Sequence, residues 1–450
     1  MKNLLLLIAL CAGFIGFAQT LSYNDIGVLI TNEKIDGTAR FNAMSGAFGS
    51  LGGDITAIES NPAGAAVFLN SEVAMSLNFN GIDTKASYYG VTSNSNTNPV
   101  RFAQAGGVFV FKPNYSANND GWRKFAFAFD YSTANEFENF WSVIGNSNYP
   151  TWTVDPNDDN PLYYDSSDGQ YFENSTSGRT NKYTFTVASQ YKNNLYIGAS
   201  LISYNADYYQ LTLLEENNYS SLNNDFLEAS SIQELSTYGN GFSFNLGLIA
   251  KPSKNTRIGL AYQSPVWYNM DETFLEYDTE VYYSNVGQTY SDYSGVSNFY
   301  YNLRTPSKVT GSFAYIFDKY GLLSIDYIYK NYSKIELRNG PFGGENQAFR
   351  NNMNGVSEVR VGTEWRIKKA SVRGGYHFEQ SPYKDAISSD NLEGWSAGLG
   401  YNFGMVKFDL SYLQSSKTAP YNFYPNYPEV NSVELDFKTS KVTATLIISI

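Results

Sequence analysis

The chain has 450 residues, a formal net charge of −12 and a mean hydropathy of −0.34, and 16% of its residues are aromatic, with 38 Tyr and 30 Phe. An acidic chain of this kind does not suit nucleic acid, whose phosphates are bound by Lys and Arg. The single cysteine, Cys11, excludes a secreted scaffold held together by disulfide bonds.

The first 18 residues have the pattern of a secretion signal. Lys2 supplies a positive start, residues 4–17 are apolar, and Gly16 and Ala18 are the small residues expected before a cleavage site. We therefore expect residues 1–18 to be a signal peptide. Beyond them no stretch approaches the roughly 18 to 20 apolar residues that a spanning helix needs, which excludes a helical membrane protein.

Residues 19–70 are rich in Gly, Ala and Ser and only weakly helical. They contain the stretch GGDITAIESNPAGAAVF at 52–68, in which a proline stands between an asparagine and small residues. Such a sequence forms a rigid turn with little side-chain bulk. We therefore expect a compact piece to precede the main fold.

From residue 71 the chain repeats short segments in which apolar residues alternate with small or polar ones, as in strands with one apolar face. In KFAFAFDYS, for example, Phe125, Phe127 and Phe129 point to one side while Ala126 and Ala128 point to the other. This alternation predicts about fourteen strands. They lie near residues 71–80, 102–112, 123–133, 182–192, 194–206, 241–251, 256–265, 307–317, 321–331, 357–367, 370–379, 394–403, 405–413 and 441–450.

The connections between these strands alternate between short and long. The short ones include KNN, KPSKNT, DKY, KKA and FGM. The long ones, which we interpret as loops, are 81–101, 134–181, 207–240, 266–306, 332–356, 380–393 and 414–440. Outer-membrane barrels have short periplasmic turns and long outward loops. The pattern therefore predicts an all-β fold, a transmembrane antiparallel β-barrel formed by residues 71–450, located in the cell outer membrane.

The competing interpretation is a secreted all-β domain. Burying one face of about fourteen aromatic-rich strands would then require two large sheets packed together. The apolar faces lack the interdigitation of large and small residues that such a core needs, so we prefer the barrel.

A barrel of about fourteen strands leaks unless something fills its lumen. Residues 19–70 are expected to do so, as a plug or hatch whose small residues pack closely against the inner wall. Asn61, Pro62 and Ala63 would form the turn that returns the chain to the wall at the first strand.

Four features of this segment stand in order ahead of the barrel: Ala39-Arg40, Ser45-Gly46-Ala47, Asp54, and Asn61-Pro62-Ala63-Gly64. Together they resemble the start of the long-chain fatty acid transporter family, the FadL/TodX-type outer membrane proteins. The resemblance covers residues 20–450. It implies a fourteen-stranded barrel, an N-terminal hatch with an Asn-Pro-Ala motif, and passage of hydrophobic molecules across the outer membrane.

The chain departs from the family pattern at two places. Gly53-Asp54 stands where members often carry paired acidic residues, and Ile450 stands where many such barrels end in an aromatic residue. The FAQ sequence at the cleavage site and the Asn- and Tyr-rich loops resemble Bacteroidetes proteins.

Charged residues occupy the inward positions of the later strands and predict a lumen wall of mixed charge. In one interpretation these charges pair across neighbouring strands and hydrate a polar interior. In the other, Arg360 and Arg373 bind a ligand carboxylate through bidentate contacts. His377, on the same strand as Arg373, is a third candidate ligand-binding residue.

An enzyme is a further class to weigh. His377 is the only histidine, so a Ser-His-acid site would have to use it. It is expected within the lumen beside Glu379, away from the rim, and no Ser lies in a nucleophile-elbow sequence. The sequence has no phosphate-binding loop and no Cys/His metal cluster. We therefore expect no enzyme, no cofactor and no metal.

The resemblance implies uptake of hydrophobic small molecules, such as a long-chain fatty acid, by diffusion through the hatch-plugged barrel. The partners would be this ligand and the lipids and lipopolysaccharide of the outer membrane, with no nucleic acid. The alternative is a barrel of the same family that acts as a scaffold or docking component of a secretion system, with secretion-machinery proteins as partners and no transport of its own. A continuous apolar pocket beneath the loops would favour transport.

Overall fold

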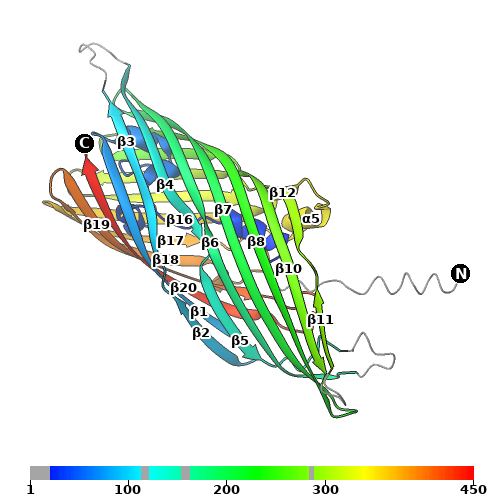
Figure 1. Cartoon of the computed structure of the whole chain (residues 1–450). Helices are drawn as coiled ribbons and strands as arrows, with labels where there is room; N and C mark the ends of the chain where they lie inside the picture. The colour runs from blue at the N-terminus through cyan, green and yellow to red at the C-terminus, as the bar shows by residue number, and fades with distance from the viewer. Residues whose placement is uncertain (1–20, 113–120, 154–162, 283–287) are drawn as a thin grey trace.

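The computed structural model describes residues 21–112, 121–153, 163–282 and 288–450. Its strands form one antiparallel sheet that closes on itself, because β1 (Glu72–Tyr88) pairs with β20 (Val433–Ser449). The result is the expected 14-stranded barrel, and Figure 1 shows the N-terminal segment within it. Closure leaves no unpaired edge to face lipid. The predicted signal peptide and Cys11 lie outside the described residues.

Several of the wall strands consist of two or three β-strands in line. Between β1 and β20 the wall runs through β2 (Val91–Thr97) with β3 (Val100–Phe111), β4 (Trp122–Glu136) with β5 (Asn139–Gly145), β6 (Ser166–Tyr191), β7 (Leu195–Ser220), β8 (Asp225–Ala250), β9 (Thr256–Gln263) with β10 (Trp267–Tyr282), β11 (Gln288–Tyr293) with β12 (Ser297–Arg304) and β13 (Lys308–Phe317), β14 (Gly321–Asn331) with β15 (Glu336–Arg338), β16 (Gly355–Ile367), β17 (Ala370–Glu379), β18 (Leu392–Asn402) and β19 (Val406–Tyr421).

The side chains of the wall alternate as the sequence predicts. In β4, Phe127 is 52% exposed on the outer face, whereas Ala128 is only 6% exposed and faces the lumen. In β20, Leu446 points outward while Thr445 is buried inside. The apolar outer face meets lipid and the small or polar inner face meets the hatch.

The short connections lie together at one end of the barrel. Several of them turn through residues with positive φ: Lys192, Asp318, Lys368 and Gly404. These positions let a strand reverse within a few residues. Because short turns are periplasmic in outer-membrane barrels, this end faces the periplasm and the opposite mouth faces outward.

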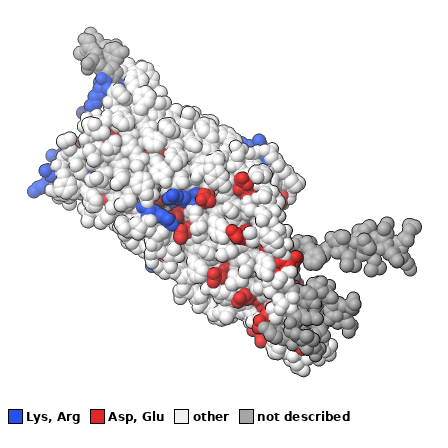
Figure 2. Space-filling view, viewed as in Figure 1, with Lys and Arg blue, Asp and Glu red and all other residues white. Residues whose placement is uncertain are grey.

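The prediction of long loops is wrong for most of residues 81–101, 134–181, 207–240, 266–306 and 414–440. β6, β7 and β8 have 26 residues each, and residues 207–240 form one hairpin of β7 and β8. Acidic side chains are scattered over this extension in Figure 2. Outward residues here include polar ones such as Asp207 and Glu228 among apolar ones such as Leu211 and Phe226, because this part of the wall stands in water. The regular apolar alternation that identifies a lipid-facing strand is therefore interrupted.

The segment ahead of β1 forms four short helices in the lumen: α2 (Tyr23–Thr31), α3 (Ala39–Ala43), α4 (Ala57–Ser60) and the 3-10 helix η1 (Pro62–Val67). Ser22 and Asp25 form a capping box at the start of α2, each side chain accepting from the other's backbone N–H. Thr38 caps α3 by accepting from the N–H of Phe41. Pro62 begins η1, where its missing N–H costs nothing.

The connections at the outer mouth fold over the lumen. They include α5 (Gly343–Asn352), η2 (Tyr332–Lys334) and η3 (Ser388–Asp390). Phe349 of α5 is fully buried against α2, and a Cβ on Gly27 would lie 2.7 Å from its ring. α5 thus covers α2. No helix in the described ranges is long and apolar enough to cross a membrane.

Replacing Phe127 by Arg is expected to hinder assembly. The substitution puts a charge on the lipid face of β4, at a cost of about 2 to 4 kcal/mol near the bilayer midplane. The folded fraction can be followed by heat-modifiable gel mobility and by urea unfolding in vesicles. Phe127→Leu, which keeps the site apolar, is the control. Equal stability of the two variants would show that Phe127 does not face lipid.

Candidate functional site

The hatch rests on a ring of inward-facing glycines in the wall, which we call the glycine girdle. A Cβ built on any of them would lie between 2.0 and 2.7 Å from a hatch atom, well inside van der Waals contact. Only glycine permits so close an approach of hatch to strand. The girdle consists of Gly198, Gly247, Gly259, Gly362, Gly375 and Gly398, from β7, β8, β9, β16, β17 and β18.

Asn61, the first residue of the hatch motif, bonds both its own helix and the wall. Its Oδ1 accepts from the N–H of Ala63 at 3.1 Å. Its Nδ2 donates to the carbonyl oxygens of Gly49 at 2.7 Å and Leu248 at 3.0 Å. Pro62 and Ala63 meanwhile lie over girdle residue Gly198. The motif therefore holds η1 at a fixed place on β7 and β8.

Beneath the hatch, buried charges link α3 to the later strands. Arg40 Nε lies 2.7 Å from Glu364 Oε2. Glu364 Oε2 also lies 2.8 Å from Arg373 Nε, and Arg373 Nη1 lies 2.7 Å from Asp409 Oδ1. His377 contacts Ser415 at 2.9 Å through Nε2. Every one of these wall groups is engaged by the hatch or by another wall residue.

Above α3 and η1, at the outer half of the lumen, helix α2 of the hatch lies in a space lined by apolar side chains, which we call the apolar chamber. Ile26 is 1% exposed and Ile30 4% exposed within it. The walls of the chamber include Ile202, Tyr204, Tyr208, Leu235, Tyr268, Met270, Tyr301, Leu303, Ile335, Leu337, Phe342, Phe349 and Val356. A continuous apolar surface under the outer loops is therefore present, and α2 fills it.

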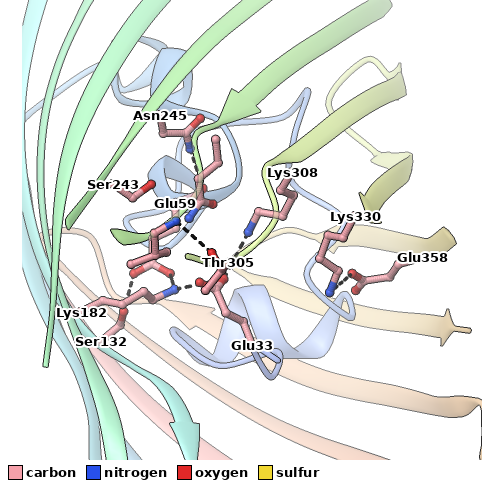
Figure 3. A network of polar contacts seen from close by, with 12 residues as sticks. Glu33, Glu59, Ser132, Lys182, Ser243, Asn245, Thr305, Lys308, Lys330 and Glu358 are labelled. Atoms are coloured by element: carbon pink, nitrogen blue, oxygen red, sulfur yellow. Dashed lines mark hydrogen bonds and ion pairs between the residues drawn. The ribbon is translucent and has the colours of Figure 1, made fainter. Parts of the chain in front are cut away.

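At the inner end of the chamber the carboxylate of Glu33 contacts two wall lysines, as Figure 3 shows. Lys308 Nζ lies 3.2 Å from Glu33 Oε2, and Lys182 Nζ lies 3.9 Å from the same oxygen. The hydroxyl of Tyr204 donates to Oε1 at 3.0 Å. Lys182 also pairs with Glu59 of α4 at 2.5 Å. We call Lys182 and Lys308 the lysine pair.

Glu33 is charged at neutral pH. Burial alone would raise the pKa of its carboxyl group, but the ammonium groups of Lys308 and Lys182 hold that pKa well below its usual range. The contact between hatch and lysine pair is thus a partly desolvated ionic one, which is worth more than a surface ion pair.

A cavity of about 40 Å³ lies beside Glu33. Its lining includes Ile30, Lys308, Lys330 and Arg360. A space of this size holds a few water molecules and no hydrophobic ligand. Binding of a hydrophobic ligand beside Glu33 therefore needs a movement of the hatch.

The three sequence-derived candidates have different surroundings. Arg360 lines the cavity and pairs with Glu358 of its own strand. Arg373 instead lies near Arg40, and His377, opposite Arg360 in the β16–β17 ladder, has its Nδ1 3.3 Å from Ser45 Oγ; neither of them lines the cavity. The structure therefore brings only Arg360 to the cavity.

Sequence reasoning missed Glu33, Lys182 and Lys308. Lys182 is the first residue of the predicted strand segment 182–192 and Lys308 the second of 307–317, and both occupy inward positions, so each could have been noted as a lone inward cation. Glu33 follows α2 in a segment without periodicity, and no sequence signal marks it. Among the described residues, no group of three or more His, Cys, Asp or Glu is placed to hold a metal ion.

The barrel wall has a gap in its hydrogen-bond ladder between β3 and β4. Pairing runs from Phe111↔Phe125 to Gln104↔Ser132 and stops there, although β3 continues outward to Val100. Each strand keeps its ladder with the neighbour on the other side. We call this gap the seam.

Charged side chains border the seam. Arg101 pairs with Glu136 at 2.7 Å and with Glu138 at 2.6 Å. A second small cavity, of about 10 Å³, lies there against hatch residue Asp36. Over this stretch the wall is therefore closed by side chains rather than by backbone hydrogen bonds, and such a stretch opens at a lower free-energy cost than a hydrogen-bonded one.

Solved structures of similar fold include a FadL homologue and toluene transporters. A FadL homologue from Pseudomonas aeruginosa matches with a TM-score of 0.59 at 14% identity, over 93% of this chain and 99% of that one. The toluene transporter TodX of P. putida matches with a TM-score of 0.55 at 13% identity, over 92% of this chain and 99% of that one. The toluene transporter TbuX of Ralstonia pickettii matches with a TM-score of 0.52 at 15% identity, over 92% of this chain and 98% of that one. At such identities the likeness shows the fold alone.

No curated protein matches the chain significantly. The family described as outer membrane protein transport protein (OMPP1/FadL/TodX) matches residues 24–419, which is most of the chain. The barrel and the placement of the N-terminal segment agree with that match. The protein therefore belongs to the OMPP1/FadL/TodX family of outer-membrane β-barrel proteins.

Proposed function

We propose that this protein is a channel for uptake of hydrophobic small molecules of the long-chain fatty acid type, by diffusion through the hatch-plugged barrel. The observation that carries the proposal is the apolar chamber beneath the outer loops, an inward-facing apolar surface against which α2 packs. A hydrophilic solute needs no such surface, whereas the surface removes an apolar chain from contact with water. Family membership supports transport. That the ligand carries a long acyl chain is part of our proposal.

The route that best fits the wall begins at the outer mouth and leaves through the seam. The glycine girdle holds the inner half of the hatch tightly, so a straight path to the periplasm is blocked. The seam, in contrast, can open without breaking ladder hydrogen bonds. Arg101 and Asp36 border it, and its closure depends on side chains that can change rotamer.

Deletion of the gene is expected to abolish protein-dependent uptake of a radiolabelled long-chain fatty acid, because passive diffusion through an outer leaflet of lipopolysaccharide is slow. Uptake should return when the gene is supplied again. Uptake of a small hydrophilic solute through other channels is the control and should stay constant. Unchanged fatty acid uptake in the deletion strain would contradict the proposal.

A docking role in a secretion system is the second candidate. It is favoured by the extension of β6, β7 and β8 beyond the lipid, whose outward acidic residues include Asp207, Glu215 and Glu228. Such a face could bind a basic partner. The same deletion strain separates the two candidates: loss of secretion of another protein with normal fatty acid uptake would favour docking.

A further inference from the structure

α2 and the residues that follow it present three kinds of group to the lumen wall in order along the chain. They are the aromatic ring of Tyr23, the aliphatic side chains of Ile26 and Ile30, and the carboxylate of Glu33. Each group meets a matching surface. An amphiphilic acid has the same order of groups, with apolar groups first and a single carboxylate at the end.

The ring of Tyr23 lies among three aromatic side chains near the outer mouth. Its centroid is 6.2 Å from that of Phe299, 5.3 Å from that of Tyr301 and 5.2 Å from that of Phe342. All three contacts are edge-to-face, with interplanar angles of 88°, 84° and 77°. This is the favoured geometry for aromatic pairs. The cage would accept another apolar group in place of Tyr23.

At the inner end of the chamber, Lys308 requires an anion as its partner. Among the ion pairs of the described residues, Lys308 contacts no carboxylate other than that of Glu33. Lys182 retains Glu59 when Glu33 leaves. Withdrawal of α2 would therefore leave Lys308 partly buried and unpaired beside Arg360 and Lys330, which is costly.

We propose that Glu33 and α2 occupy the ligand's own site, and that the ligand which displaces them is an amphiphile with one carboxylate, received by Lys308, Lys182 and Tyr204 while its tail lies in the apolar chamber. The inference rests on the proposed function and adds the head-group site, the ligand's charge and the competition. A ligand with one negative charge replaces the negative charge that leaves the site when Glu33 is displaced. A neutral ligand of the same length leaves Lys308 unpaired.

Competition and simple anchoring make opposite predictions for Glu33. If Glu33 competes with the ligand, removing its charge frees the lysine pair and tightens binding of a carboxylate. If Glu33 only holds the hatch in shape, its loss disorders the site and weakens binding. Replacing Lys308 weakens carboxylate binding in both cases, because the carboxylate loses its partner.

The test uses the full mature protein in detergent micelles, with hexadecanoate and hexadecan-1-ol as probes of equal chain length. Equilibrium dialysis gives Kd for each. Glu33→Gln should tighten hexadecanoate binding by about tenfold, the worth of one charged hydrogen bond. It should change hexadecan-1-ol binding much less. Lys308→Met should weaken hexadecanoate binding by about tenfold and leave the alcohol nearly unaffected.

Asp36→Asn is the matched control, because it also removes a hatch carboxylate bound to a wall lysine. Asp36 Oδ2 lies 3.1 Å from Lys441 Nζ, outside the apolar chamber. This variant should leave both Kd values near those of the parent. Heat-modifiable mobility checks that every variant keeps its barrel.

Two results separate the inference from the proposed function. Weaker hexadecanoate binding by Glu33→Gln, in a parent that binds both probes, would overturn the competition and leave the channel proposal standing. A parent protein that binds neither probe would contradict the proposed function itself, and the inference with it.

Discussion

Deleting residues 21–60 from the mature chain is expected to convert a closed barrel into a conducting pore. The deletion removes α2, α3 and α4, whereas the ladder pairs of the wall strands involve none of these residues. A 14-stranded wall should therefore still close, around a lumen filled with water. Planar-bilayer recordings should show a large step conductance that the parent protein lacks.

A shorter deletion, residues 21–31, is the control for this experiment. It removes α2 alone and empties the apolar chamber, while the glycine girdle still holds α3 and η1 across the lumen. Its conductance should stay close to that of the parent. If the long deletion proved as impermeable as the parent, residues 21–60 would not be the plug.

Replacing Gly247 by Val is expected to dislodge the hatch while the barrel remains folded. A Cβ at this position would lie 2.0 Å from Asn61 Oδ1 and 2.7 Å from Pro62 Cδ. Such overlap cannot be relieved by a rotamer change, since Asn61 also bonds Gly49 and Leu248. The hatch must shift as a whole, and both leakage of small solutes and proteolysis of the N-terminal segment should increase.

Gly311→Val is the matched control for Gly247→Val. Gly311 lies in β13, and a Cβ there would meet nothing within 4 Å. The two variants add the same side chain to a wall strand, but Gly311 is in phase with outward-facing Val309 and Phe313, so its side chain does not meet the hatch. Similar leakage from both would show that the girdle does not position the hatch.

The lipid-facing part of the wall could be located from the sequence because lipid imposes a strict two-residue period. In β7, Ile197 and Leu201 are exposed to lipid, and the predicted segment 194–206 contains them. The same strand continues to Ser220 with outward residues such as Glu215, which face water. Nothing in that half distinguishes a strand from a polar loop, so its length could not be predicted.

The candidate site was only partly accessible to sequence reasoning. Inward position in a strand correctly indicates a buried wall residue, and Arg360, Arg373 and His377 are all largely buried in the lumen. Which of them faces the cavity depends on where the hatch packs. The contact of Glu33 with Lys308 joins residues 275 positions apart, and no local pattern encodes it.

The family resemblance carried by residues such as Asn61 and Pro62 identified the family of a plugged barrel that the strand alternation and the loop pattern had already predicted. The family match over residues 24–419 confirms it. The contacts of Asn61 give a physical reason for that motif: its side chain both caps η1 and bonds the wall through a gap that glycine leaves.

The tie between α3 and β20 bears on how the protein is made. The N–H of Ala39 donates to Thr445 Oγ1 at 2.7 Å and Asn42 Nδ2 donates to Thr443 Oγ1 at 2.9 Å, contacts that span 406 and 401 positions of the chain. Contacts of such sequence separation form late in folding. An early segment of the chain is thus tied to its last strand, so the hatch gains its full set of contacts only when β20 pairs with β1, and an unfinished chain is left both open-edged and permeable.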